Sequence, residues 1–184
     1  MQSSSSSCLL GLLLVAVLIA VQADGDRSYS VELNSFEPSK DFESNGKWLD
    51  WGSLRMKKVG RNQYTLAGEM DVKLNLGDEQ RLAVLVYTYD SGANQKGPLV
   101  MSVNKPFCQF VSEDKDTYPF LRKVSDLPDP TECPFPKGHY TIDNYKLETT
   151  FLPDDAPKGD YMLELNLYDQ EVPVASILAQ ITLT

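Results

Sequence analysis

Alternating apolar and polar positions are the strongest pattern in the chain, and they predict β-strands. The longest example is residues 62–76, NQYTLAGEMDVKLNL. The residues expected on its apolar face are Tyr64, Leu66, Met70, Val72, Leu74 and Leu76. A period of two is typical of a strand with one buried face and one hydrated face. Gly68 falls on the apolar face, where we expect a bend or a bulge.

Other segments repeat this alternation. They are residues 29–34, 54–57, 161–168 and 176–183. Residues 59–62, VGRN, have the composition of a hairpin turn leading into the long strand. The run RLAVLVYTYD at 81–90 is apolar on both faces, which predicts a central strand of a sheet.

The alternation changes phase within residues 138–152. Tyr140 and Ile142 share one parity, whereas Tyr145, Leu147 and Phe151 share the other. A β-bulge near residues 143–144 would return these side chains to one face.

One region departs from the strand pattern. Residues 107–125 place Phe107, Phe110 and Val111 at helical spacing, and Pro119 prevents one continuous helix. We therefore expect a helical turn, a break and a second turn. The whole pattern predicts an all-β fold, an immunoglobulin-like β-sandwich of seven or eight antiparallel strands with a short helical insertion around 107–125.

The N-terminus has the pattern of a secretory signal. Residues 8–21 are almost entirely apolar and end in Val21-Gln22-Ala23, which a signal peptidase accepts. We expect cleavage of residues 1–23, a single domain over residues 24–184, and an extracellular location. An uncleaved membrane anchor is the alternative interpretation.

Charge narrows the possible partners. The net charge is −9, and residues 1–23 carry none of it. An acidic protein is poorly suited to nucleic acid, and the chain has no polybasic patch for anionic membranes.

Cysteine and histidine are too few for most catalytic or metal sites. After cleavage only Cys108 and Cys133 remain, and in an oxidising compartment they are expected to form one disulfide. His139 is the single histidine, so a thiol–imidazole pair with Cys133 is the alternative. Zinc needs more His or Cys ligands than the chain has. We expect no enzyme activity, no metal and no cofactor.

Four segments combine cysteine, proline, glycine and aromatic residues: NKPFC (104–108), YPFL (118–121), ECPFPKGHYTIDNY (132–145) and LPDDAPKGDY (152–161). Together they resemble a family of secreted insect proteins of unknown function that includes the chemosensory B proteins. The resemblance implies a fold similar to the ML lipid-recognition superfamily, whose two sheets part to admit a lipid. It also implies that Cys108 and Cys133 are the family's paired cysteines.

Aromatic side chains on the predicted strands either form an ordinary core or line a cavity, and the pattern alone does not separate these possibilities. The candidate apolar pocket consists of Phe107, Phe110, Phe120, Tyr140, Tyr145, Phe151, Tyr161 and Leu163. We expect a secreted binder or carrier of a lipid or other apolar small molecule, in a chemosensory role by resemblance. The alternative is an extracellular interaction module or an accessory subunit of a membrane receptor or channel.

Overall fold

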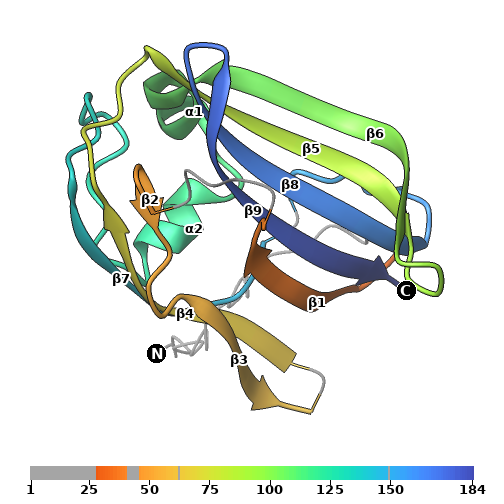
Figure 1. The fold of residues 1–184 in the computed structure, drawn as a ribbon. Coiled ribbons are helices and arrows are strands. Elements are labelled where there is room, and N and C mark those ends of the chain that lie inside the picture. Colours follow the sequence, from red (N-terminus) through yellow and green to blue (C-terminus); the bar gives the residue numbers. More distant parts are fainter. Residues whose placement is uncertain (1–27, 41–45, 62, 149) are drawn as a thin grey trace, which may run out of the picture.

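The computed structural model describes residues 28–40, 46–61, 63–148 and 150–184 (Figure 1). The predicted signal peptide, residues 1–23, lies outside these described residues. The described part forms two antiparallel sheets packed as a sandwich, with two short helices inserted after one long strand. The predicted fold class is therefore confirmed.

Five strands form the larger sheet. They are β1 (Val31–Pro38), β5 (Gln80–Asp90), β6 (Gln95–Pro106), β8 (Gly159–Asp169) and β9 (Val172–Leu183). The spatial order is β1-β9-β8-β5-β6. β5 lies between β6 and β8, as its apolar composition predicts. Its Val84 and Val86 contact the sandwich core, whereas Tyr87 lies beside Leu99 and Met162 on neighbouring strands.

The second sheet is built around β4 (Gln63–Val72). Three strands pair with it: β2 (Leu49–Asp50), β3 (Arg55–Gly60) and β7 (Gly138–Tyr145). The predicted hairpin is confirmed, because Gly60 pairs directly with Gln63.

The predicted faces of β4 need two corrections. Leu74 is 45 % exposed because the strand ends at Val72 and the alternation does not continue beyond it. Thr65, expected on the hydrated face, is buried between β3 and β7, where its hydroxyl lies 3.4 Å from the side-chain oxygen of Asn144.

Both expected irregularities occur at one place in this sheet. Leu66 pairs with Tyr145 and Gly68 pairs with Ile142, so β7 contributes one extra residue there. Gly68 has a φ of +136° and Asn144 a φ of +55°. The bulge turns Ile142 and Tyr145 to the same side, and both are buried.

The helical insertion is also confirmed. It consists of α1 (Phe107–Glu113) and α2 (Tyr118–Arg122), with Pro119 in the first turn of α2, where a missing N–H is tolerated. The carboxylate of Asp114 accepts hydrogen bonds from the backbone N–H groups of Asp116, Thr117 and Tyr118, which fixes the break between the helices. Within the described residues, no helix is long and apolar enough to cross a membrane.

The nine strands in the described part exceed the seven or eight expected. The sequence pattern predicts neither the two-residue β2 nor β6. β6 contains Gly97 and Pro98 and lies at the edge of its sheet, where proline is tolerated because one side of the strand needs no ladder bonds.

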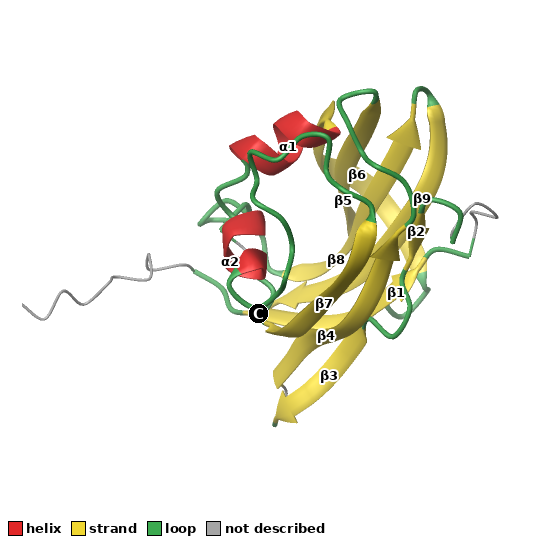
Figure 2. Cartoon of the chain, turned by 90° about the vertical axis from the view of Figure 1, so that its left-hand side faces the viewer, coloured by secondary structure: helices red, strands yellow, loops and turns green. Residues whose placement is uncertain are grey.

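The two sheets are closest along β1 and diverge toward β6 and β7. β1 contacts β3 and β4 at the closed side. At the open side, α1 contacts β5 and β6 while α2 contacts β7, so the helices fill the space between the sheets (Figure 2). We call residues 107–122 the helical wedge.

Candidate functional site

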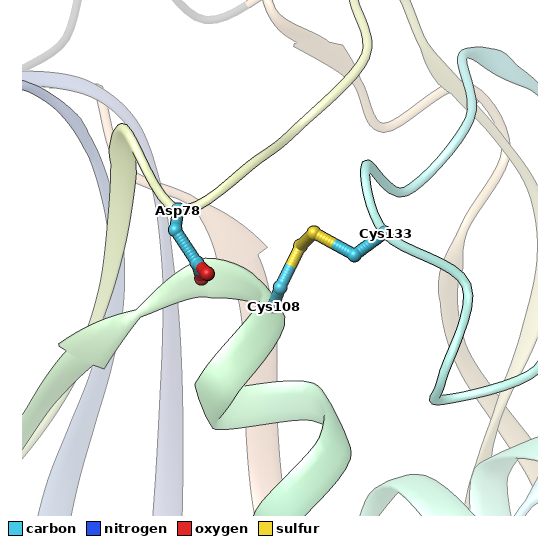
Figure 3. A group of neighbouring side chains, drawn as sticks. All are labelled: Asp78, Cys108 and Cys133. Atoms are coloured by element: carbon cyan, nitrogen blue, oxygen red, sulfur yellow. A yellow bond between two sulfur atoms is a disulfide. The ribbon is translucent and has the colours of Figure 1, made fainter.

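The helical wedge is fastened to the loop that precedes β7. The predicted disulfide is confirmed: Cys108 in α1 is bonded to Cys133 (Figure 3). Two residues further on, Phe135 exchanges backbone hydrogen bonds with Leu76, at 2.9 and 2.8 Å. These links join α1, the β4–β5 connection and the loop before β7 into one corner of the molecule.

Side chains of α2, the second half of the wedge, form hydrogen bonds to the loop at 127–129 and hold α2 in place. The hydroxyl of Tyr118 donates to the carbonyl of Pro128 at 3.0 Å. The guanidinium of Arg122 donates to the Leu127 carbonyl at 3.3 Å and to the Asp129 carboxylate at 3.1 Å. Burial raises the pKa of Tyr118 well above its ordinary value, so this phenol stays neutral and able to donate.

Two clusters of buried apolar side chains form the core. The β1-side cluster consists of Tyr29, Leu33, Leu54, Leu66, Val86, Ile142, Tyr145, Leu152, Tyr161, Leu163, Ile181 and Leu183. The disulfide-side cluster consists of Leu49, Val72, Leu76, Phe107, Val111, Tyr118, Leu127, Phe135, Tyr140, Leu167, Val174 and Ala175.

The structure divides the eight candidate pocket residues between these clusters. Phe107 and Tyr140 belong to the disulfide-side cluster, and Tyr145, Tyr161 and Leu163 belong to the β1-side cluster. Phe120 and Phe151 are half-buried and pack against the β1-side cluster, whereas Phe110 is half-buried and belongs to neither. That these residues enclose a ligand stays a prediction.

The two clusters meet at three partly buried side chains, Trp51, Met70 and Leu121, which pack against both. We call these three residues the seam. The indole N–H of Trp51 is enclosed there without a hydrogen-bond acceptor among the described residues. A buried donor without an acceptor costs free energy, so a ligand oxygen that accepts this hydrogen bond would be bound more tightly.

Phe135 was not among the predicted site residues, although it connects two of them. Its ring lies 5.6 Å from that of Phe107 and 5.4 Å from that of Tyr140, in edge-on geometry. Its position between two prolines carries no periodic signal, because the loop is not a regular strand. Only the disulfide and the bridge to Leu76 bring it into the core.

A repeated local motif explains part of the sequence resemblance in structural terms. Residues 136–140 are PKGHY and residues 157–161 are PKGDY. In each, the tyrosine hydroxyl donates to the carbonyl of the proline four residues earlier: Tyr140 to Pro136 at 2.7 Å, and Tyr161 to Pro157 at 2.6 Å. In the first copy glycine leaves room for the tyrosine, since a Cβ at Gly138 would lie 3.1 Å from the Tyr140 hydroxyl; in the second copy Gly159 instead has a φ of +145°. The motif starts a strand in both places and resembles a tyrosine corner.

His139 points away from the core while Tyr140 points into it, as the alternation predicts. The His139 Nδ1 lies 2.7 Å from the Asp71 carboxylate, and its Nε2 lies 3.7 Å from Glu69. The hydrogen bond with Asp71 raises the pKa of His139 above its ordinary value, while hydrogen bonds from Lys73 and His139 lower the pKa of Asp71. The Cys133 sulfur is bonded to Cys108, so Cys133 and His139 do not form a thiol–imidazole pair.

One group of potential metal ligands lies close together in the described part. A carboxylate oxygen of Asp78 and the sulfurs of Cys108 and Cys133 lie within 4.8 Å of one another (Figure 3). The two sulfurs are bonded to each other and offer no thiolate, and metal binding by cysteine requires the thiolate. The group therefore does not fit a metal ion.

A surface depression in the described part of the chain lies beside this disulfide. It has a volume of about 470 Å³ and opens to solvent. Its lining consists of Trp48, Leu74, Asn75, Gly77, Asp78, Glu79, Gln80, Cys133 and Pro134. We call it the disulfide depression. None of the eight candidate pocket residues lines it.

Comparisons with known proteins give a match to one family model over part of the chain and no activity. No curated protein matches the chain. Residues 83–163 match a family model described as "Protein of unknown function (DUF1091)". This segment runs from within β5 to within β8 and contains the helical wedge, the disulfide and β7. The expected resemblance to a family of unknown function is supported in part: residues 83–163 carry a DUF1091 family domain.

Proposed function

We propose that the protein is a secreted, non-catalytic binding protein for a lipid or another apolar small molecule, held between the two sheets beneath the helical wedge. The observation that carries this proposal is the way the open side of the sandwich is closed. Strand pairing does not close it. Two short helices do, and they cover the core with half-buried apolar side chains such as Phe120 and Leu121. The resemblance to the ML superfamily, whose sheets part to admit lipid, supports the same site.

The wedge is a suitable element to move when a ligand enters. α2 has five residues, and its Tyr118 and Arg122 side chains form hydrogen bonds to the loop at 127–129. Short elements with few buried contacts open at a lower free energy than the strands of a sheet. Displacing Phe120 and Leu121 would expose the β1-side cluster and the seam.

The seam suggests the chemistry of the ligand. Its surroundings are apolar, and the Trp51 indole N–H supplies one donor. An apolar chain with one oxygen acceptor, such as a fatty acid or an ester, fits both features. The disulfide and the signal-like N-terminus support an extracellular setting.

The proposal is tested with protein secreted from insect cells. Native mass spectrometry before and after organic extraction detects a bound lipid, and displacement of a fluorescent fatty acid measures binding by the extracted protein. We expect a lipid adduct, and we expect Phe120→Asp to weaken probe binding at least ten-fold. Leu99→Asp is the matched control, because Leu99 is 51 % exposed on β6 and should leave binding unchanged. Absence of both adduct and probe binding in the unmodified protein would refute the proposal. Equal probe binding by Phe120→Asp and Leu99→Asp would show that the ligand does not bind at the wedge.

A further inference from the structure

The disulfide depression has a chemistry different from that of the core. Its lining includes the apolar residues Trp48, Leu74 and Pro134 and the disulfide-bonded Cys133. The lining also includes two acidic residues, Asp78 and Glu79. No lysine or arginine lines the depression, and within the described residues neither carboxylate forms a salt bridge.

Local structure holds these groups in place. The Asp78 carboxylate accepts a hydrogen bond from the backbone N–H of Gln109 at 3.2 Å, which ties it to α1. The buried Gln80 accepts from the Gly77 N–H at 2.9 Å and donates to Asp169 at 3.0 Å, which fixes the turn that carries both carboxylates. The bridge between Leu76 and Phe135 sets the spacing between this turn and the opposite wall.

We propose that the disulfide depression binds a small organic cation, a quaternary or protonated amine with an apolar body. The face of a tryptophan attracts such a cation through its quadrupole, and the two carboxylates add Coulomb attraction. Leu74 and Pro134 contact the apolar part of the ligand. A volume of about 470 Å³ is ample for a ligand of choline size. The exposed position of Leu74, which strand alternation alone does not predict, places an apolar side chain in this wall.

This site is independent of the proposed lipid site. It uses none of the wedge residues Phe120 and Leu121 and none of the seam. Failure of lipid binding therefore does not affect the cation site, and the reverse also holds.

The test compares choline with 3,3-dimethylbutan-1-ol, which has the same shape and no charge. Binding to the disulfide-intact protein is measured by calorimetry and by two-dimensional amide NMR at low salt. We expect choline to bind at least about ten-fold more tightly than the alcohol, with shifts confined to residues 74–80 and 133–134, and to weaken as salt is added. Equal affinities, or shifts elsewhere, would overturn the proposal.

Substitutions of Asp78 and Glu79 test whether their carboxylates contribute to the affinity for choline. Asp78→Asn keeps an oxygen that can accept the Gln109 N–H, so the fold should persist, and we expect about three- to five-fold weaker choline binding. Asp78→Asn combined with Glu79→Gln should abolish the preference for choline over the alcohol. Asp90→Asn is the matched control, since Asp90 is another exposed aspartate that accepts a backbone N–H, here from Ala93. Wild-type choline affinity in the double variant, with an unchanged NMR spectrum of the free protein, would refute the assignment.

Discussion

Removing the disulfide tests whether the helical wedge depends on it. The change is Cys108→Ala with Cys133→Ala, which leaves no unpaired thiol at this position. In the folded protein the bond joins α1 to the loop before β7, across 25 residues of chain. Without it, the same loop must be closed by packing and by the hydrogen bonds between Leu76 and Phe135.

The magnitude follows from the length of that loop. Closing 25 residues in the unfolded chain costs about 3.5 kcal/mol at 25 °C in the chain-entropy model, and the disulfide removes this cost from folding. For a domain of this size, that loss lowers the melting temperature by roughly 7–14 °C. Cys108 is buried, so the alanine substitution adds a small packing loss to the entropic one.

Urea unfolding followed by fluorescence measures the change, with the thiol-reduced natural chain as the control. The reduced chain keeps both cysteine side chains and lacks only the cross-link, so it separates loop entropy from packing. We expect the reduced chain to lose about 3–4 kcal/mol of unfolding free energy and the alanine variant slightly more. Hydrogen exchange should increase first in α1 and in residues 133–136. A loss below about 1 kcal/mol in the reduced chain, or faster exchange spread evenly over both sheets, would refute the reasoning.

Three further changes test other parts of the fold. Gly68→Ala should lower the free energy of unfolding by more than about 3 kcal/mol, because it combines a positive φ with a Cβ 2.4 Å from a backbone oxygen. Gly159→Ala also has a positive φ, but its Cβ enters open space, so it should cost about 1–3 kcal/mol. Urea unfolding measures both changes. Tyr161→Phe removes the hydrogen bond to the Pro157 carbonyl and should lower the free energy of unfolding by about 0.5–1.5 kcal/mol. Tyr64 has no such hydrogen bond in the described structure, so Tyr64→Phe should lower it by less. The pKa of His139 is raised in the folded protein, so protonated His139 stabilises the fold. This stabilisation is complete below the unfolded pKa of about 6.5 and is lost as the pH rises through the folded pKa. Melting temperatures of His139→Gln and the natural chain should therefore converge at alkaline pH, and a constant difference would contradict this.

Period-two alternation and turn chemistry predict much of this fold, because each depends on neighbouring residues. The change of phase in residues 138–152 locates the bulge at Asn144, and Gly68 marks the opposite strand at the same level. The long apolar run at 81–90 identifies the central strand. The composition of residues 107–125 predicts two helical turns with a break between them; the break lies at residues 114–117, and Pro119 lies in the first turn of α2.

The unpredicted features depend on contacts between distant segments. β6 is a mostly exposed edge strand, so it lacks the apolar alternation that a buried face imposes. Phe135 is held in the core by its pairing with Leu76 and by the neighbouring disulfide at Cys133. The division of the aromatic residues into two clusters depends on how far the sheets diverge, which no single segment encodes. The sequence therefore identifies apolar side chains but not which of them lie together.

That division limits how the sandwich can hold a ligand. The buried members of both clusters are closely packed, and removing large side chains from such packing costs several kcal/mol, so a ligand does not enter by displacing Ile181 or Leu167. The half-buried side chains cost less to move, because part of their surface is already hydrated. Among them, Phe120 and Leu121 lie on a five-residue helix at the open side of the sandwich, and Leu121 also belongs to the seam. The proposed ligand, by displacing these two side chains, would reach both clusters at a lower packing cost than by displacing fully buried residues, which is why the wedge is the part of the molecule to test first.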